Sequence, residues 1–539
     1  MTECVETDVA VIGGGVTGVG VLRDLALRGI RAVLIEKGDL GHGTSTRNHG
    51  LLHSGCRYAV RDPEAAIESY HENLILKRIV PGSIERTDGL FVKLPEDTDS
   101  YAEKWLASCK NLGIPVTEVA LEQAFKEEPF LNRKAQAVFV VPDGAIDDFT
   151  LLIDTAEDAK RHGAHVLTYH EVTDLMIDQG RVSGLICSDT TSGKQTEIHA
   201  PIVVNAAGPW EGKIAKLAGI HFEIINNKGM LVVFSHRFNK HVINRLRMPS
   251  DGDIFVPAHD VTIFGTTGKN VRDPEDFSLN RAELDDMLAQ GRALIPTIRE
   301  MRLIRAYAGS RPLYQAHAAS GSSGRDVTRG MALIDHEARD GIAGLISITG
   351  GKLTTFRLMA EKTVDLICEK MGINVACTTD QIPLPDRRSE AFLRQEQLAP
   401  AAKNKLFHWA GTHTAEIKTR LKATQAGQVL CECEQVTWAE IEAAIPKQGP
   451  FNLGDIRRRT RLGMGPCQGT FCQFRAAALA GEKGVTSCHE ADQAICRSIR
   501  ERQKGMAIVA TGETAKQLQL MDAIYKVSLG FQKEEKAHV

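Results

Sequence analysis

Four cysteines near the C-terminus have the spacing to hold a metal centre. Cys431 and Cys433 form a C-x-C pair, and Cys467 and Cys472 form a C-x4-C pair. Thiolates paired this closely, in two segments that folding can bring together, favour a 2Fe-2S cluster over a disulfide. Zinc is the main alternative, but both spacings depart from the usual C-x2-C of zinc sites, and zinc would give electrons no route. The quartet therefore predicts a centre that passes single electrons.

A dinucleotide-binding motif lies at the other end of the chain. Residues 7–12 (TDVAVI) read as a buried parallel strand, residues 19–28 as a helix, and a second strand ends in Glu36. Glycines in the turn let the backbone approach a pyrophosphate at the helix N-terminus, and Glu36 would accept hydrogen bonds from ribose hydroxyls. The glycines that satisfy G-x-G-x-x-G are Gly13, Gly15 and Gly18.

The motif alone does not choose between nicotinamide and flavin, but two later segments bear on the choice. The segment 41–60 is rich in Gly, Ser, Thr and His, so it is not an ordinary crossover helix. Such a loop would place hydroxyls and backbone amides along an extended cofactor. The segment VVNAAGPW around Asn205 ends a strand in small residues, which indicates either a close approach to a ligand or a plain turn.

Length and composition set the class of protein. At 539 residues the chain is too long for one core, and 43% hydrophobic and 25% charged residues are typical of a soluble globular protein. A net charge of −3 gives no support to nucleic-acid binding. Sparse cysteines and the lack of an apolar leader favour a reducing cytoplasm. No segment reads as membrane-spanning, which leaves peripheral attachment through a partner.

Five segments together resemble the FAD-dependent glycerol-3-phosphate dehydrogenases, a family of D-amino-acid-oxidase-like flavoproteins. The C-terminal quartet is similar to that of the anaerobic members, which carry an added bacterioferritin-associated-ferredoxin-like (BFD-like) domain. The resemblance covers nearly the whole chain and implies FAD and a 2Fe-2S cluster as cofactors. The segments that carry it are GGGVTG, STRNHGLLHSGCRY, NAAGPW, AGSRPL and GGKLTTFR.

The resemblance also assigns residues to sites. A phosphate monoester needs cationic donors, and arginine matches its oxygens in bidentate fashion, although spacing alone would not select particular arginines. The resemblance selects Arg57, Arg311 and Arg329, with Tyr58 lining the same pocket. It places these further residues at the flavin: Thr44, Ser45, Asn48, Gly50, Leu51, Ala207, Gly208, Gly351, Lys352, Leu353 and Thr354.

Lys352 follows a buried strand and a double glycine, so we expect it to face the flavin ring or the substrate oxygen. A base must also take the proton of the substrate's C2 hydroxyl. Some aerobic relatives carry a histidine just after a Lys-Gly step, but here Leu231 stands at that place. His49, His53 and Lys352 itself are the alternatives.

The predicted fold class is α/β, a Rossmann-like FAD-binding fold of the D-amino-acid-oxidase-like type with an antiparallel substrate sheet and a small helical ferredoxin-like domain. Residues 254–267 read as two antiparallel strands with a turn near His259 and Asp260. The expected divisions are an FAD and substrate domain at 1–375, its substrate sheet inserted at about 75–140 and 220–310, a linker region at 376–426, a BFD-like domain at 427–500, and a C-terminal helix and tail at 501–539.

Within the predicted cluster domain, Thr437 and Glu440 have the spacing of a helix capping box. A run of arginines follows, for which two interpretations stay equal. The guanidinium groups offset the negative charge of an iron–sulfur centre, or they form a solvated helix face. The run comprises Arg457, Arg458, Arg459 and Arg461.

The resemblance implies oxidation of sn-glycerol 3-phosphate to dihydroxyacetone phosphate, with electrons passing through the cluster. It implies partner flavin and iron–sulfur subunits that anchor the enzyme to the inner face of the cell membrane and pass electrons to a quinone. One alternative is a related FAD-dependent amine or 2-hydroxy-acid dehydrogenase with the same relay. Another is a non-catalytic electron-transfer or iron-handling adaptor.

Overall fold

The computed structural model describes residues 3–314, 330–385, 398–409, 414–421, 427–446 and 450–531. A six-stranded sheet forms the nucleotide-binding part, in the order β10-β3-β2-β14-β22-β21. All its strands run parallel except the edge strand β21. The strands are β2 (Val9–Ile12), β3 (Ala32–Glu36), β10 (His165–Thr168), β14 (Ile202–Asn205), β21 (Met331–Asp335) and β22 (Leu345–Gly350).

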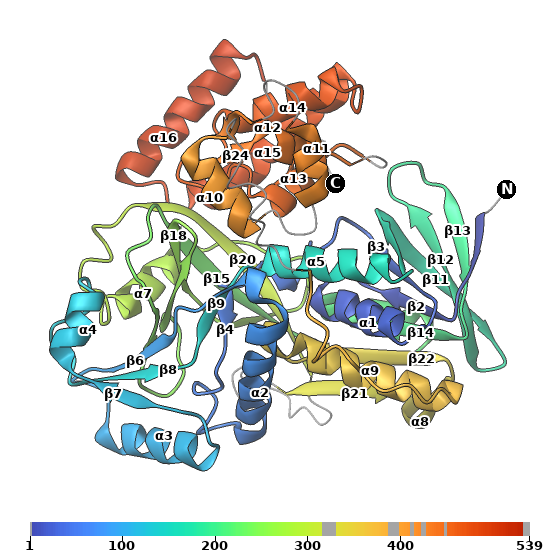
Figure 1. The fold of residues 1–539 in the computed structure, drawn as a ribbon, viewed down its shortest axis with the longest axis horizontal. Coiled ribbons are helices and arrows are strands. Elements are labelled where there is room, and N and C mark those ends of the chain that lie inside the picture. Colours follow the sequence, from blue (N-terminus) through green and yellow to red (C-terminus); the bar gives the residue numbers. More distant parts are fainter. Residues whose placement is uncertain are drawn as a thin grey trace.

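Three helices cover one face of this sheet: α1 (Val16–Leu27), α5 (Asp148–Arg161) and α9 (Phe356–Met371). Val9, Val11 and Leu34 are buried beneath them, as expected for strands covered on both sides. A four-stranded sheet covers the other face, in the order β1-β13-β12-β11 (Figure 1). Its strands are β1 (Glu3–Glu6), β11 (His170–Asp178), β12 (Arg181–Asp189) and β13 (Gln195–His199).

A nine-stranded sheet stands beside the nucleotide-binding part and is largely antiparallel. The predicted hairpin is confirmed: β17 and β18 pair with Ala258 opposite Val261, and His259 in the turn has a φ of 53°. The strands are β6 (Gly89–Lys93), β7 (Thr117–Val119), β8 (Ala137–Val141), β15 (Ile225–Phe234), β16 (Val242–Arg245), β17 (Ile254–Ala258), β18 (Val261–Gly265), β19 (Lys269–Val271) and β20 (Leu303–Leu313).

Shorter elements connect the two sheets. A three-stranded sheet, β4 (Leu51–Leu52), β9 (Gly144–Ile146) and β5 (Ile84–Glu85), ties the loop after β3 to the nine-stranded sheet. The remaining elements here are η1 (Thr44–Thr46), α2 (Pro63–Ile79), η2 (Pro81–Ser83), α3 (Asp99–Asn111), α4 (Leu121–Glu127), η3 (Gly208–Trp210), α6 (Glu211–Leu217), α7 (Arg281–Gly291), α8 (His336–Asp340) and η4 (Leu353–Thr355).

The C-terminal part is helical and has its own apolar core. The capping box is confirmed, because Thr437 accepts from the Glu440 amide and Glu440 accepts from that of Thr437. A short hairpin, β23 (Val429–Cys431) and β24 (Val436–Thr437), precedes five helices and a π-helical turn: α12 (Trp438–Ala444), α13 (Leu453–Thr460), α14 (Cys472–Glu482), α15 (Cys488–Ala507), α16 (Gly512–Ala523) and η7 (Ile524–Ser528).

The structure differs from the expected divisions in two places. The range 376–426, predicted as a linker, contains α10 (Pro400–Trp409) and α11 (Thr414–Arg420), which pack against α12 through an apolar cluster. The expected boundary at residue 500 falls inside α15. No helix among the described residues is both long and apolar enough to cross a membrane.

The six-stranded and nine-stranded sheets with their helices form the part of the chain where the sequence predicts a flavin, and we call it the flavin-type part. The C-terminal part lies on it, over α5, β18 and β20 (Figure 1). Helix α13 contacts α5, and α15 contacts β20. The second contact is close: a Cβ added to Gly505 on α15 would lie 2.5 Å from the backbone oxygen of Ala306. This packing brings α13 to Asp39, three residues beyond the carboxyl end of β3.

Candidate functional site

A cavity of about 2360 Å³ runs from the N-terminus of α1 to the loops of the cysteine quartet. Its glycine turn follows β2. Gly13 has a φ of 112°, and an added Cβ would lie 2.5 Å from the Ala206 oxygen. A Cβ on Gly18 would lie 1.9 Å from the Gly13 oxygen. Only glycine fits at these two positions, and the turn leaves the first amides of α1 facing the cavity, as a pyrophosphate requires.

Glu36 lies at the end of β3, beside the glycine turn. Its carboxylate accepts from the Gly14 amide at 2.7 Å and from the Gly38 amide at 2.9 Å. Burial raises its pKa, against the opposing effect of these two hydrogen bonds. Because the same carboxylate lines the cavity, it retains acceptor capacity toward a bound ribose. Turn, helix and acid therefore fit the adenosine end of a dinucleotide.

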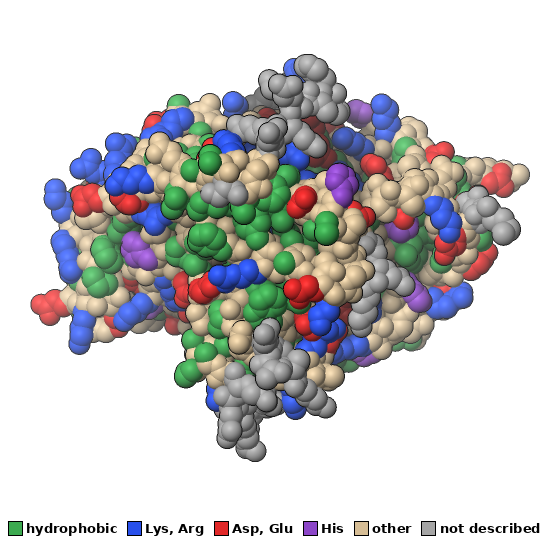
Figure 2. Space-filling model, turned by 90° about the horizontal axis from the view of Figure 1, so that it is seen from above, with side chains coloured by type: hydrophobic (Ala, Val, Ile, Leu, Met, Phe, Trp, Pro, Cys, Tyr) green, Lys and Arg blue, Asp and Glu red, His purple; other side chains and the backbone are tan. Residues whose placement is uncertain are grey.

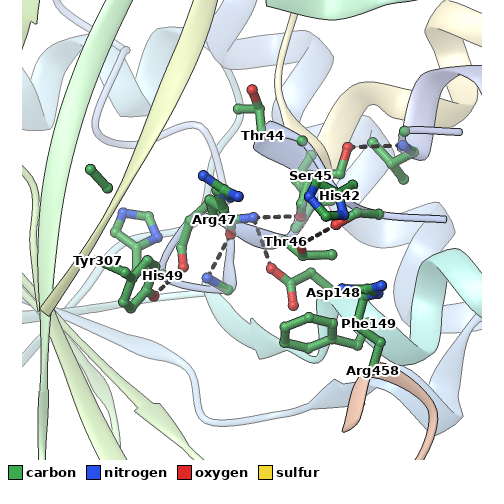
Figure 3. Close-up of a pocket in the computed structure, with 18 of the residues that line it drawn as sticks. His42, Thr44, Ser45, Thr46, Arg47, His49, Asp148, Phe149, Tyr307 and Arg458 are labelled. Carbon is green, nitrogen blue, oxygen red and sulfur yellow. Dashed lines mark hydrogen bonds between the residues drawn. The ribbon is translucent and has the colours of Figure 1, made fainter. Parts of the chain in front are cut away.

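The loop after β3 is fastened by its own polar side chains (Figure 3). Ser45 Oγ accepts from the Val16 amide at 2.9 Å. Asn48 donates to Asp148 Oδ2 at 2.9 Å and accepts from the Gly50 amide at 2.7 Å. These bonds hold the loop along the cavity wall, which also includes Gly15, Thr44, Leu51, Ala207, Gly208, Gly351, Lys352 and Leu353. The wall is thus built from the segments expected to contact a flavin.

Thr354 is placed differently from its neighbours. It is 0% exposed, and its hydroxyl accepts from the backbone amide of His53 at 3.1 Å. The 3-10 turn η4 is held by a bond from the Lys352 amide to Thr355 Oγ1 at 3.1 Å. Thr354 therefore positions the loop that carries His53. The two glycines before Lys352, Gly350 and Gly351, have φ values of 73° and 64°.

Two arginines from different elements converge on His49. Arg57 donates to Asp253 Oδ2 at 3.1 Å, and Arg311 on β20 donates to Asn227 Oδ1 at 3.0 Å. Nδ1 of His49 is buried and has no hydrogen-bond partner among the residues that the structure describes. Burial, and then the positive charges of Arg311 and Arg57, lower the pKa of His49 to about 3. The site therefore holds a neutral imidazole near two cations.

Lys352 and Tyr58 stand at the same end of the cavity. Lys352 Nζ donates to the Ala65 oxygen at 3.2 Å and lies 4.8 Å from the centre of the Tyr58 ring. The Tyr58 hydroxyl is 3.3 Å from Nε2 of His53, whose ring centre is 6.2 Å from that of His49. The structure thus brings together every substrate residue expected from sequence except Arg329, which lies outside the described residues.

Leu231 lies on β15 opposite Tyr307 and is 1% exposed. A side chain packed in this way offers no proton acceptor. Of the alternatives for the base, His49 is the one whose ring nitrogen has no hydrogen-bond partner in the described part of the chain.

The four cysteines gather in two pairs. The thiols of Cys431 and Cys472 are hydrogen-bonded, and Cys433 lies against Cys467. The bond from Cys472 lowers the pKa of Cys431 to about 6, helped by the Gly463 and Glu434 amides, although burial opposes the shift. Amide bonds to sulfur are typical of iron–sulfur sites. Among the residues that the structure describes, no three or more His, Cys, Asp or Glu side chains are arranged to hold a metal ion.

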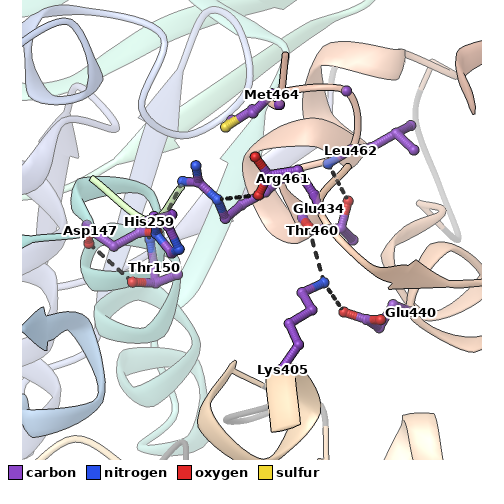
Figure 4. A network of polar contacts seen from close by, with 12 residues as sticks. Asp147, Thr150, His259, Lys405, Glu434, Glu440, Thr460, Arg461, Leu462 and Met464 are labelled. Carbon is purple, nitrogen blue, oxygen red and sulfur yellow. Dashed lines mark hydrogen bonds and ion pairs between the residues drawn. The ribbon is translucent and has the colours of Figure 1, made fainter. Parts of the chain in front are cut away.

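The predicted arginine run does not form a solvated face. Asp39 of the flavin-type part pairs with Arg458 at 3.0 Å and with Arg459 at 2.7 Å. Arg461 pairs with Glu434 at 2.9 Å and with Asp147 at 3.3 Å (Figure 4). These pairs join the cluster loops to the residues that flank the cavity.

Asp147 is a second anchor of this junction. His259 lies 2.7 Å from it, and Arg461 is close by. Burial opposes ionisation, but His259 and Arg461 hold the pKa of Asp147 below its usual value. The carboxylate is therefore charged where the two parts meet.

Sequence reasoning missed the residues that orient the arginines. Asn227 and Asp253 hold Arg311 and Arg57, while Asp39 and Asp147 hold the arginine run. No local motif marks these residues, because their partners come from distant segments. Asp39 is the one of these residues that lies beside a motif, three residues after Glu36, the acid of the dinucleotide motif.

The chain matches two family models. Residues 8–366 match the FAD dependent oxidoreductase family, and residues 429–482 match the BFD-like 2Fe-2S binding domain, which spans all four cysteines. The flavin-type part and the helical part of the fold thus correspond to two known domains.

Curated relatives cover almost the whole chain. An anaerobic glycerol-3-phosphate dehydrogenase subunit from Escherichia coli K12 is 40% identical over 98% of both chains. The subunit of the same name from Haemophilus influenzae is 39% identical, over 97% of this chain and 93% of its own length. The solved glycerol-3-phosphate dehydrogenase of Bacillus halodurans, complexed with FAD, has a TM-score of 0.64 at 22% identity, covering 98% of this chain and 97% of its own.

Fold and site define an FAD-dependent oxidoreductase that carries a BFD-like 2Fe-2S domain. The predicted fold class and both predicted cofactors are confirmed. Within that class, the chain belongs to the anaerobic glycerol-3-phosphate dehydrogenase family, in the subunit type that these two relatives represent.

Proposed function

We propose that this chain oxidises sn-glycerol 3-phosphate to dihydroxyacetone phosphate and passes the electrons through its 2Fe-2S centre to a partner protein. One observation carries the proposal: Arg57 and Arg311, from separate segments, lie near enough to the half-buried, neutral His49 in the flavin cavity to lower its pKa. Two cations suit a phosphate, and a neutral imidazole suits an alcohol that must lose a proton. The relatives' names agree with this substrate.

The two arginines are oriented before a ligand arrives. Arg57 also donates to the Ser250 oxygen at 3.3 Å, and Arg311 also donates to the Thr267 oxygen at 3.2 Å. A guanidinium held in one plane loses less entropy when it binds two phosphate oxygens. We therefore place the substrate phosphate between Arg57 and Arg311. Arg329 is proposed as a third donor on the family resemblance.

His49 is our choice for the base that removes the C2 hydroxyl proton. Its pKa of about 3 keeps the imidazole neutral at neutral pH, so one of the two ring nitrogens carries a lone pair that can accept a proton. His53 is a weaker choice, since its Nε2 already contacts the Tyr58 hydroxyl. Lys352 carries a positive charge that would stabilise negative charge developing on the flavin or on the substrate oxygen. When bound, FAD supplies the acceptor for the hydride that leaves C2.

For the onward route we propose a protein partner on the cluster face, defined by Phe471, Leu520, Val527 and Leu529. Phe471 lies between two cysteine ligands and is 52% exposed, and Val527 is 83% exposed. Helix α16 lies beside this loop, because Gln517 donates to the Cys467 oxygen at 2.9 Å. Hydrophobic side chains gather on the C-terminal part as seen from above (Figure 2). Partner flavin and iron–sulfur subunits, membrane attachment and a quinone acceptor are part of this proposal.

The proposal is tested by anaerobic titration of the iron-replete flavoprotein with glycerol 3-phosphate, a 2-hydroxy acid and an amino acid. We expect glycerol 3-phosphate alone to bleach the flavin and then to produce the EPR signal of a reduced cluster. Reduction by one of the other two substrates instead would support the related dehydrogenases. A cluster without any substrate-driven bleaching would support the adaptor.

Arg311→Ala sharpens the substrate test. Loss of one charge-assisted phosphate contact should reduce transition-state stabilisation by about 2 kcal/mol, which lowers kcat/KM for glycerol 3-phosphate roughly 30-fold. The matched control is Arg281→Ala, which removes an exposed arginine paired with Asp285. Equal kcat/KM values for the two variants would remove Arg311 from the substrate site.

A further inference from the structure

A second group of arginines lies where the C-terminal part meets the flavin-type part. We call it the arginine cluster: Arg47, Arg305, Arg457 and Arg502. They come from the loop after η1, from β20, from α13 and from α15. All four line the large cavity, and Arg47 is visible in Figure 3 beside the cofactor loop.

The donors of the cluster are incompletely used. The Nε atoms of Arg305, Arg457 and Arg502 are each buried without a hydrogen-bond partner among the described residues. Arg502 is 4% exposed; one of its terminal nitrogens bonds the Gly463 oxygen and Gln468 Oε1. A buried donor without an acceptor costs about 1–3 kcal/mol, so three of them in one place point to a missing acceptor.

The charges of the cluster are also unbalanced. Burial and then Arg502 and Arg305 lower the pKa of Arg457, and burial and Arg305 lower the pKa of Arg502 to about 10. Glu501 is the carboxylate that acts on Arg47, Arg305 and Arg457, and it bonds Lys504 at 2.9 Å. Arg47 also lies near Glu275, which pairs with Lys37 at 2.9 Å. One shared carboxylate does not offset several guanidinium groups in a low-dielectric site.

The sites already described do not account for the cluster. An iron–sulfur centre would offer negative charge to Arg502, which lies near Cys467 and Cys472. The charged neighbours of Arg305 and Arg457 do not include these cysteines. The arginines around the substrate base are Arg57 and Arg311. The pyrophosphate of FAD belongs at the glycine turn between β2 and α1.

We propose that the arginine cluster binds the phosphate group of a second small molecule, distinct from FAD and from the substrate, between the flavin and the 2Fe-2S centre. Arginine forks from three elements match the oxygens of a phosphate monoester better than a single carboxylate, because phosphate offers more acceptor oxygens and more negative charge. The phosphate belongs either to a tightly held organic cofactor or to a phosphate that exchanges with solution.

The first arm of the test separates these sources. The purified holoprotein is denatured, its phosphorus is measured against FAD, and the released small molecules are identified by mass spectrometry. Phosphorus beyond the two groups that FAD carries, in an organic compound, identifies a held cofactor. If no extra phosphorus is released, the second arm decides.

In the second arm, thermal unfolding of the holoprotein is followed with inorganic phosphate and, at equal ionic strength, with chloride. We expect phosphate to stabilise wild-type and Arg311→Ala protein, and its apparent affinity to fall about tenfold or more in Arg457→Met. Without phosphate, Arg457→Met should unfold at a higher temperature than wild type, because it relieves repulsion. Arg281→Met is the matched control, and Arg305→Met repeats the test from the other part if Arg457→Met does not fold.

Three results would overturn the proposal. One is no extra phosphorus together with no phosphate-specific stabilisation. Another is stabilisation that disappears in Arg311→Ala and persists in both Met variants, which would assign it to the substrate site. The last is a loss of stability in both Met variants that does not depend on phosphate, which would make the arginines structural.

Discussion

At the scale of single residues, burial and then two nearby positive charges keep a histidine in the cavity neutral. Arg57 and Arg311 face His49, and each guanidinium is fixed by an acceptor from another strand or loop. The same pair would bind a phosphate and leave the imidazole able to accept a proton. Sequence alone weighed three candidates for the base and could not rank them, because ranking depends on burial and hydrogen bonding.

His49 of the cofactor loop gives a prediction about pH. Burial lowers the pKa of His49 to about 3. The unfolded chain takes up a proton at this residue near pH 6.5, so between pH 6.5 and the folded pKa it binds more protons than the folded chain. The free energy of unfolding therefore falls as pH decreases through this window, by about 2 kcal/mol from pH 6.5 to pH 5.

The prediction is checked by comparing denaturant unfolding of wild type and His49→Gln between pH 5 and pH 7. The variant should show a shallower dependence on pH. His489→Gln, at an exposed position, is the control and should keep the wild-type slope. Parallel curves for wild type and His49→Gln would mean that folding does not lower the pKa of His49.

At the scale of elements, α13 decides how the two parts meet. The sequence predicted the arginine run but left its role open, and the structure shows three of its four side chains, those of Arg458, Arg459 and Arg461, paired with Asp39 and Asp147 across the junction. Local signals were reliable where an element is defined by near neighbours, as in the capping box at Thr437 and the hairpin at His259. They failed for α10 and α11, whose apolar face is satisfied only by packing on α12.

Asp39→Asn should loosen this junction. Asp39 is 2% exposed and faces two arginines, so removing its charge leaves buried cations without a partner and costs about 3 kcal/mol. We expect faster amide hydrogen exchange in α13 and slower reduction of the cluster after substrate is added. Flavin reduction by substrate should stay close to wild type.

The control for this prediction is Asp285→Asn, which breaks an exposed ion pair on α7. Stopped-flow absorbance follows flavin and cluster separately. Unchanged exchange in α13 and an unchanged rate of cluster reduction would show that the Asp39 pairs do not hold the junction.

At the scale of the whole molecule, one cavity connects a two-electron site to a one-electron site. It extends from Gly13 and Glu36 to Gly463 and Cys472, so residues of both parts line it. Such an arrangement would let a reduced flavin be reoxidised by the cluster in single-electron steps while the flavin stays bound.

Removing one ligand of the cluster should separate the two half-reactions. In Cys433→Ser, glycerol 3-phosphate should still bleach the flavin at a near wild-type rate, while the EPR signal of the reduced cluster is lost. Cys488→Ser, at an exposed cysteine outside the quartet, should retain both steps. If Cys433→Ser also loses flavin reduction, the centre is needed for the fold of the site as well as for electron transfer.

The cluster face gives a prediction about assembly. Phe471→Ser removes a half-exposed aromatic side chain beside the metal loop, so we expect weaker association with the partner subunits and a normal cluster spectrum. Co-purification with the partner subunits measures association, and Leu74→Ser, an exposed apolar residue on α2, is the control. Wild-type recovery of partners by Phe471→Ser would place the interface elsewhere.

The sequence by itself determined the features that depend on short stretches of chain. These are the glycine turn and its acid, the cysteine pairs, the capping box and the family motifs. These depend on backbone geometry and on neighbours a few residues away. Only the tertiary structure decided that Arg57 and Arg311 face His49, that Asp39 and Asp147 hold α13, and that arginines from distant elements share one cavity. Such contacts are set by burial and by the packing of segments hundreds of residues apart, and no local pattern encodes them.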